Sequence, residues 1–281
     1  MVRIVTDSAA DLTLEQAKEL NVDIVRLKVM FGDTFFYQEE DSGNKNFYKM
    51  LAESKQLPTT SQPNPDDFLS IYKQAKEAGD SVVVITLSGE LSGTLQSATI
   101  AKGMIDYDEI YIVDSRQVTS GQQLLVEYAV SLRSKGMGAK EIYEIISQSV
   151  AKVKIVAMVD TLEFLQKGGR ISKGTAVIGS ILNVKPIIIV DKGSGKLDVV
   201  DKGRGVKNSI GILCSLIADS GEIDTSVPVY YGYTNEQTNC DLFIDEAQER
   251  FGFPMYRTVS VGGVIGTHAG PGAVVLAFLL K

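Results

Sequence analysis

Short runs of apolar, β-branched residues recur along the first half of the chain, and each run stops at a polar segment. The runs are Val2–Val5, Ser81–Leu87 and Ile110–Val113. They stop at Thr6-Asp7-Ser8, Ser88-Gly89 and Asp114-Ser115, respectively. Helical spacing of apolar positions is found at 12–20, 92–103, 117–134 and 139–151. Strands that alternate with helices predict an α/β fold with a parallel sheet covered by helices.

The pattern changes after about residue 155. Ile187–Val190 and Leu197–Val200 are apolar runs joined by a Gly- and Ser-containing segment, 191–196, which predicts a β-hairpin. Further helices are expected at 205–219 and 236–250, and further strands at 227–233 and 273–280. We therefore predict two domains: an N-terminal α/β domain over residues 1–155, and a C-terminal α+β domain with a mostly antiparallel sheet over residues 156–281.

Four polar loops are candidates for a ligand site. In open α/β sheets, ligands bind outside the carboxyl ends of the strands. The loops that we expect to meet there are all rich in Ser, Thr or Asp. They are 6–8, 59–63, 88–94 and 114–116.

Composition and charge narrow the range of partners. Hydrophobic residues make up 44% of the 281 residues and charged residues 22%, as in ordinary globular proteins. The formal net charge of −7 provides no basic field for a nucleic acid. Cys214 and Cys240 have no metal-binding or CxxC spacing, which is typical of free thiols in a reducing compartment.

The same sequence predicts a cytoplasmic protein. Asp7 interrupts the first apolar run too early for the core of a signal peptide. No apolar stretch reaches the ~20 residues that an integral membrane span requires. We expect no such span.

Catalytic and metal-binding patterns are not matched. Ser92 lies one residue too far from Gly89 for the G-x-S-x-G turn of hydrolases. The segment 193–196 resembles a phosphate-binding loop, but Val190 stands where the first glycine is required, so the hairpin is favoured. His268, in a Gly-rich segment that we interpret as a loop, is the single histidine, which excludes mechanisms and zinc sites built on two imidazoles. We expect no catalytic residue, metal or cofactor.

Hydroxyl groups near two predicted helix starts have two interpretations. Thr59-Thr60-Ser61-Gln62-Pro63 leads toward a helix cap near Asn64, and Ser92 precedes the helix at 92–103. Each segment by itself is typical of a capping turn. A helix start also binds anions, because its free backbone N–H groups and its dipole point at the ligand. Capping and carboxylate binding are therefore compatible at one place.

Six segments, taken together, closely resemble the bacterial DegV family over nearly the whole chain. They are Thr6–Leu12, Thr60–Pro63, Leu91–Thr94, Val113–Ser115, Leu162–Ile171 and His268–Ala273. The resemblance implies a two-domain protein that buries a fatty acid between or beneath its domains and is similar to the binding subunits of bacterial fatty-acid kinase. It implies that a separate ATP-dependent kinase subunit phosphorylates the bound carboxylate, yielding acyl phosphate for phospholipid synthesis, while the carrier binds no ATP.

The resemblance also implies roles for residues. Thr60 and Ser92 are expected to donate hydrogen bonds to the carboxylate of a long-chain fatty acid such as palmitate, stearate or oleate. Neighbours that help are Ser61, Gly93 and Thr94, and His268 completes the carboxylate network. Arg170 and Arg204 match basic positions that face the kinase. We expect 117–132 and 176–182 to line the tunnel for the acyl chain.

Two alternatives differ in class from a carrier. In a serine-dependent esterase or hydrolase, Ser92 or Thr60 is the nucleophile and His268 the base. In a non-catalytic structural or regulatory protein, such as a lipid sensor, the cavity is a vestige and the protein has no kinase partner. The sequence suggests a monomer, because no coiled-coil pattern is evident.

Overall fold

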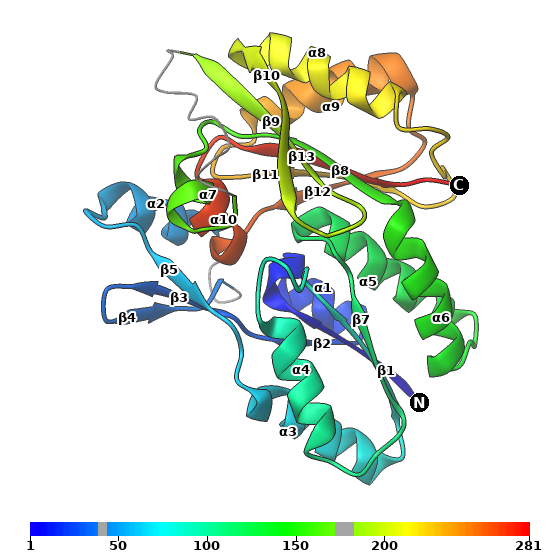
Figure 1. The fold of residues 1–281 in the computed structure, drawn as a ribbon. Coiled ribbons are helices and arrows are strands. Elements are labelled where there is room, and N and C mark those ends of the chain that lie inside the picture. The colour runs from blue at the N-terminus through cyan, green and yellow to red at the C-terminus, as the bar shows by residue number, and fades with distance from the viewer. Residues whose placement is uncertain (39–43, 172–182) are drawn as a thin grey trace.

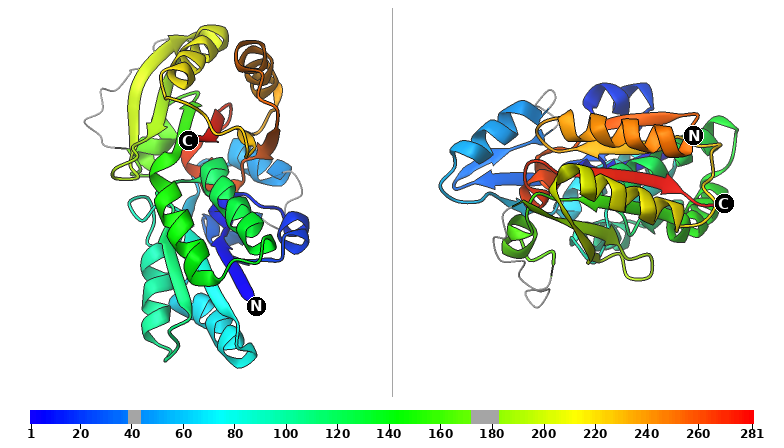
Figure 2. Two further views of the ribbon diagram at one scale, coloured as in Figure 1. Left: turned by 90° about the vertical axis from the view of Figure 1, so that its right-hand side faces the viewer. Right: turned by 90° about the horizontal axis from the view of Figure 1, so that it is seen from above.

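The computed structural model describes residues 1–38, 44–171 and 183–281. Helices and sheets alternate in layers from α8 (Gly205–Ala218) and α9 (Thr238–Phe251) at the top of Figure 1 to α3 (Pro65–Ala78) and α4 (Thr94–Gly103) at the bottom. Two large sheets lie on either side of α5 (Thr119–Ser134), and a small third sheet projects beside them (Figures 1 and 2).

The N-terminal sheet is parallel throughout, as the sequence predicts. Its strand order is β2-β1-β6-β7. The strands are β1 (Val2–Asp7), β2 (Val22–Val25), β6 (Ser81–Thr86) and β7 (Ile110–Asp114). Val82 and Val84 of β6 pack in one hydrophobic cluster, and Val83 and Ile85 pack in another. Both faces of the sheet are therefore buried, since alternate strand residues point to opposite faces.

Helices cover the two faces in pairs. One face carries α3 (Pro65–Ala78) and α4 (Thr94–Gly103). The other face carries α5 (Thr119–Ser134) and α6 (Ala139–Ser149). Short helical segments lie at η1 (Ser8–Ala10), α1 (Leu14–Glu19) and η4 (Val150–Lys152). Because α5 also contacts the second sheet through β8, β11 and β13, it forms a shared core layer.

The second sheet is mostly antiparallel, which confirms the predicted fold class. Its order is β10-β9-β8-β13-β11-β12, and β11 with β12 is the parallel pair. The strands are β8 (Val153–Met158), β9 (Val184–Val190), β10 (Leu197–Arg204), β11 (Val229–Tyr233), β12 (Tyr256–Ser260) and β13 (Val274–Leu279). Its outer face packs on α8 (Gly205–Ala218) and α9 (Thr238–Phe251). The predicted hairpin is present as the pair β9 and β10. The expected domain boundary at residue 155 falls within β8, and the division into two domains stays a prediction.

The third sheet was not foreseen. It is antiparallel, in the order β4-β3-β5, with β3 (Lys28–Phe31), β4 (Thr34–Phe36) and β5 (Thr59–Ser61). The helices α2 (Lys45–Glu53), α7 (Glu163–Lys167) and α10 (Gly263–Ala269) lie near it. The prediction of a loop at 59–63 was therefore wrong for residues 59–61, because three polar residues become a strand when a distant β3 offers its edge.

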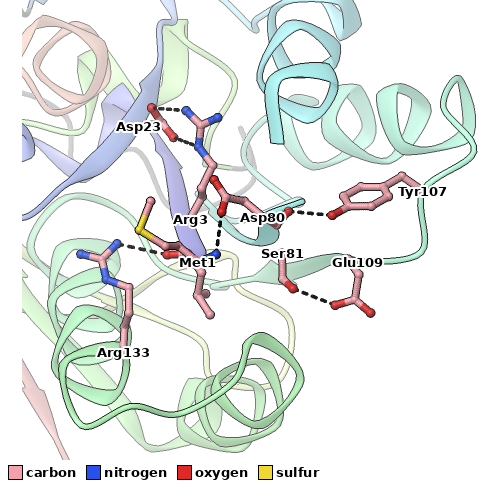
Figure 3. Close-up of polar contacts among 9 residues, drawn as sticks. Met1, Arg3, Asp23, Asp80, Ser81, Tyr107, Glu109 and Arg133 are labelled. Atoms are coloured by element: carbon pink, nitrogen blue, oxygen red, sulfur yellow. Dashed lines mark hydrogen bonds and ion pairs between the residues drawn. The ribbon is translucent and has the colours of Figure 1, made fainter. Parts of the chain in front are cut away.

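Polar contacts tie the strand starts of the N-terminal sheet together, at the end opposite the polar loops (Figure 3). The amino group of Met1 contacts Asp80 Oδ1 at 2.6 Å, and Arg3 Nε donates to Asp23 Oδ2 at 3.0 Å. These contacts are partly exposed, and exposed pairs contribute about 0–1 kcal/mol each. Burial in the two hydrophobic clusters on its faces, rather than these ion pairs, holds the sheet in place.

Candidate functional site

A cavity of about 280 Å³ lies where β5, the loop before α4, and α10 meet. We call it the polar cavity because hydroxyl, amide and imidazole groups gather on its wall among apolar side chains. It gathers most of the residues singled out from the sequence. Those that line it are Thr60, Ser61, Ser92, Gly93, Arg170 and His268. Gln62 also lines it, and its side-chain amide donates to Ser97 Oγ at 3.0 Å. Gln62 was quoted in the Thr60–Pro63 segment but given no role, so sequence analysis missed it.

The centre of the polar cavity is a contact between β5 and α10. Thr60 Oγ1 and His268 Nε2 lie 2.8 Å apart, within hydrogen-bond distance. Thr60 is set by the register of β5, in which it pairs with Val29 of β3. The two partners are 208 residues apart in the chain, so the fold alone brings them together.

His268 lies in a helix, so the interpretation of its segment as a loop was wrong. A Cβ at Gly263 would lie 2.8 Å from the ring of Phe47, and one at Gly266 would lie 2.7 Å from the Tyr48 hydroxyl. Glycine disfavours helices intrinsically, but here it lets α10 approach α2 closely, and packing overrides propensity. At the start of α10, the backbone N–H of Gly262 donates a hydrogen bond to Asp11 Oδ1 at 2.9 Å.

The imidazole of His268 is neutral at neutral pH. Burial, together with the nearby Arg170 cation, lowers the pKa of His268 from 6.5 to about 4. Its Nδ1 makes no hydrogen bond within the described ranges. A Cβ at Gly168 would overlap Nδ1, so this glycine allows the backbone turn after α7 to lie against the ring. A neutral imidazole offers one donor and one acceptor, without a charge.

The second hydroxyl group stands at the start of α4. Ser92 Oγ lies 2.9 Å from Thr94 Oγ1, and Gly93 is the residue that precedes the helix. Thr94 itself is buried beside the lining rather than in it. A Cβ at Gly93 would overlap the amide group of Gln62, so this glycine lets the Gln62 side chain pack closely against the start of α4. The N–H of Thr94, the first residue of α4, donates to Ser92 Oγ at 3.4 Å. The Ser92 hydroxyl thus lies at a helix start, the kind of place where anions bind.

The other two polar loops support the cavity from beneath. Asp7 Oδ2 accepts from the N–H of Leu87 at 2.8 Å, and Asp114 Oδ1 accepts from the N–H of Gly89 at 3.1 Å. Both carboxylates hold the segment that leads to Ser92. Two of the four predicted loops, 59–63 and 88–94, therefore contribute residues to the cavity lining. The other two hold the segment at residues 87–89 through hydrogen bonds.

The two arginines are not brought together. Arg170 is half-buried in the cavity wall, where Nε donates to Leu91 O at 3.1 Å and Nη1 donates to Gly168 O at 2.5 Å. Burial lowers its pKa. Arg204 is exposed at the end of β10, and it does not line the cavity.

An apolar cavity of about 70 Å³ adjoins the polar one. Its walls come mainly from β8, β9, β13 and the residues around α10, and they are aliphatic apart from Thr119 and Thr234. Of the predicted tunnel helix 117–132, Val118 and Thr119 line it. The other predicted lining segment, 176–182, lies outside the described residues.

The two cysteines are unreactive thiols. Cys214 and Cys240 are free and buried, and burial raises their pKa values to about 11 and about 12, respectively. In the described part of the chain, no group of three or more His, Cys, Asp or Glu side chains is arranged to hold a metal. Nor is any helix there both long and apolar enough to span a bilayer.

Comparisons with known proteins place this geometry in context. A family model described as "uncharacterised protein, DegV family" matches residues 1–281. The DegV domain-containing protein TTE1491 of Caldanaerobacter subterraneus subsp. tengcongensis is 31% identical over 99% of this chain and 98% of its own.

Two solved structures share the fold. A DegV family protein from Thermus thermophilus, described for its fatty acid binding, is 28% identical with a TM-score of 0.89, covering 99% of both chains. A stearic acid-binding protein from Eubacterium ventriosum is 26% identical with a TM-score of 0.88, covering 100% of this chain and 99% of its own. On the family match and the identity to its curated relative, this chain belongs to the DegV family.

Proposed function

We propose that this chain binds one long-chain fatty acid, with the carboxylate in the polar cavity and the acyl chain in the apolar cavity. The observation that carries the proposal is that the two cavities adjoin. One gathers neutral hydroxyl and imidazole groups, together with Arg170 and apolar side chains, and the other is lined almost wholly by aliphatic side chains. That division matches the two ends of a fatty acid. The fatty-acid-binding relatives of the same family support it.

Neutral donors suit a buried carboxylate. Thr60 and Ser92 offer hydroxyl donors without a formal charge. In the tautomer whose Nε2–H donates to Thr60 Oγ1, the neutral imidazole of His268 leaves the Thr60 hydroxyl free to donate. Hydrogen bonds to a charged partner contribute about 1.5–3 kcal/mol each, and no cationic side chain needs to be desolvated to make them. The guanidinium of Arg170 is nearby, but its Nε and Nη1 are committed to backbone carbonyls. We assign Arg170 to holding the Ser92 loop rather than to gripping the ligand.

The acyl chain contributes most of the affinity. Each buried methylene is worth about 0.8 kcal/mol, so a long chain outweighs the carboxylate contacts. The apolar cavity is small without a ligand, and we expect the aliphatic walls around it to separate as the chain enters.

We further propose that the bound carboxylate is presented to a separate, ATP-dependent kinase subunit in the cytoplasm, and that this chain is itself non-catalytic. Neutral donors support this role, because they leave a carboxylate oxygen able to attack a phosphoryl group, whereas a bidentate arginine would hold it in a salt bridge. Arg204 is exposed, as a kinase-facing residue must be, whereas Arg170 lies in the cavity wall.

The experiment compares fatty-acid affinity in matched variants. Thr60→Val combined with Ser92→Ala removes two donors and keeps the side-chain shape at residue 60. Each lost donor weakens binding by about tenfold to a hundredfold. Thr59→Val is the control, because Thr59 lies on the same strand but outside the cavity and exposed. Equal affinities in the double variant and the wild type would remove these hydroxyl groups from the site.

A hydrolase is the second candidate, and the Thr60–His268 contact is the observation that favours it. A hydroxyl group 2.8 Å from an imidazole is the arrangement of a nucleophile and its base. However, a histidine with a pKa of about 4 is a weak base at neutral pH, and Ser92 Oγ contacts Thr94 instead of the ring. The hydrolase predicts turnover of nitrophenyl esters that disappears in His268→Ala. The carrier predicts equal background rates in both proteins.

A further inference from the structure

The two cavities meet at a neck formed by four side chains. These residues line both the polar and the apolar cavity: Val118, Leu197, Ile265 and Ala269. A chain that leaves the polar cavity for the apolar one must pass between them. The size of these side chains therefore limits the cross-section of anything that passes.

Leu197 differs from the other three in its origin. Val118 precedes α5, and Ile265 and Ala269 belong to α10, which also carries His268. Leu197 is the first residue of β10, the strand at the edge of the second sheet. A change at residue 197 can alter the neck while the elements that hold Thr60 and His268 stay intact.

The turn before Leu197 is tied to the loop that carries Ser92. Ser88 Oγ donates to Gly195 O at 2.8 Å, and both residues are buried. Arg116 Nη1 donates to Gly193 O at 2.9 Å. An ion pair of 3.3 Å joins Lys196 to Glu90. The turn 191–196, which precedes Leu197, is thus anchored to the polar loops of the N-terminal sheet.

Gly195 makes this close approach possible. Its φ of +79° lies in the left-handed region, and a Cβ there would lie 2.6 Å from Ser88 Oγ and 3.0 Å from Arg116 Cβ. Gly193, two residues earlier, has no positive φ, and its added Cβ would meet only Asp191 Oδ1, at 3.4 Å. The two glycines form a matched pair within one turn.

We propose that Leu197 is a specificity-determining residue that selects acyl chains by their cross-section, and that the turn 191–196 positions it through Gly195. The inference rests on the proposed function, since it concerns the passage of the acyl chain. An unbranched chain passes a leucine-lined neck, whereas a methyl branch meets the isobutyl group.

The test measures dissociation constants of wild type and variants for octanoate, dodecanoate and palmitate. In the wild type, affinity rises about fourfold per added methylene. In Leu197→Trp, the indole closes the neck, so affinity stops rising once the tail reaches it, and palmitate binds at least about tenfold more weakly than to the wild type. Val200→Trp is the control, because Val200 lies on the same strand, 44% exposed, and lines neither cavity.

Two further variants keep the inference testable if the tryptophan variant does not fold. Leu197→Ala widens the neck, so the affinity ratio of a methyl-branched acid to its straight isomer rises. Gly195→Ala shifts the turn and changes this ratio, whereas Gly193→Ala leaves it as in the wild type. A wild-type dependence on chain length in Leu197→Trp, or an unchanged ratio in Leu197→Ala, would overturn the inference. Absence of binding by the wild type at every chain length would instead overturn the proposed function itself.

Discussion

The pKa of His268 makes the stability of the ligand-free protein depend on pH in a defined window. Its pKa is lowered from 6.5 to about 4 by burial and by the Arg170 cation. Between these pH values, the unfolded chain binds a proton at this side chain that the folded chain does not bind. The free energy of unfolding therefore rises with pH through the window, and it falls as the pH drops from 6.5 toward 4.

The size of the effect follows from the shift. The difference of 6.5 − 4 is 2.5 pH units, which corresponds to about 3 kcal/mol at this side chain by the linkage relation. Replacing His268 by glutamine keeps a hydrogen-bonding group toward Thr60 and removes the titration. The difference in unfolding free energy between wild type and His268→Gln should thus change by about 3 kcal/mol between pH 7 and pH 4.

Urea unfolding of delipidated protein at several pH values measures this difference. Titrating carboxyl groups elsewhere affect both proteins equally and cancel in the comparison. Parallel curves for wild type and His268→Gln across the window would refute the reasoning that the imidazole is buried and neutral. Adding fatty acid should flatten the wild-type dependence, because a carboxylate beside the ring favours its protonated form.

Two other substitutions probe the site and the core separately. Gly168→Ala would push a methyl group into His268 Nδ1, so we expect weaker fatty-acid binding in a competition assay, while Gly138→Ala, with no atom within 4 Å of its added Cβ, should bind as the wild type does. Phe243→Ala empties a fully buried position on α9, and calorimetry should show a loss of about 3–5 kcal/mol with unchanged ligand affinity, because Phe243 itself lines neither cavity; an affinity loss as large as in Gly168→Ala would contradict that separation.

The regular elements were predictable because local pattern decides them. The apolar run at 110–113 became β7 (Ile110–Asp114), and the predicted helix 139–151 became α6 (Ala139–Ser149) with a short extension. In each case the spacing of the apolar residues indicates which face of the element is buried.

What the sequence did not reveal depends on distant partners. The strand identity of Thr59–Ser61 depends on β3, and α10 forms despite its glycines because α2 lies against it. The Thr60–His268 contact and the neck at Leu197 likewise join segments far apart in the chain. The family resemblance made Thr60, Ser92 and His268 candidates for the site. Only the fold shows that they line one cavity.

The most direct test of the central claim is native mass spectrometry of freshly purified protein, followed by denaturing extraction and identification of any released molecule. The account predicts a mass excess equal to one long-chain fatty acid per chain, which disappears after extraction. A protein that is purified empty and takes up no added fatty acid would contradict it.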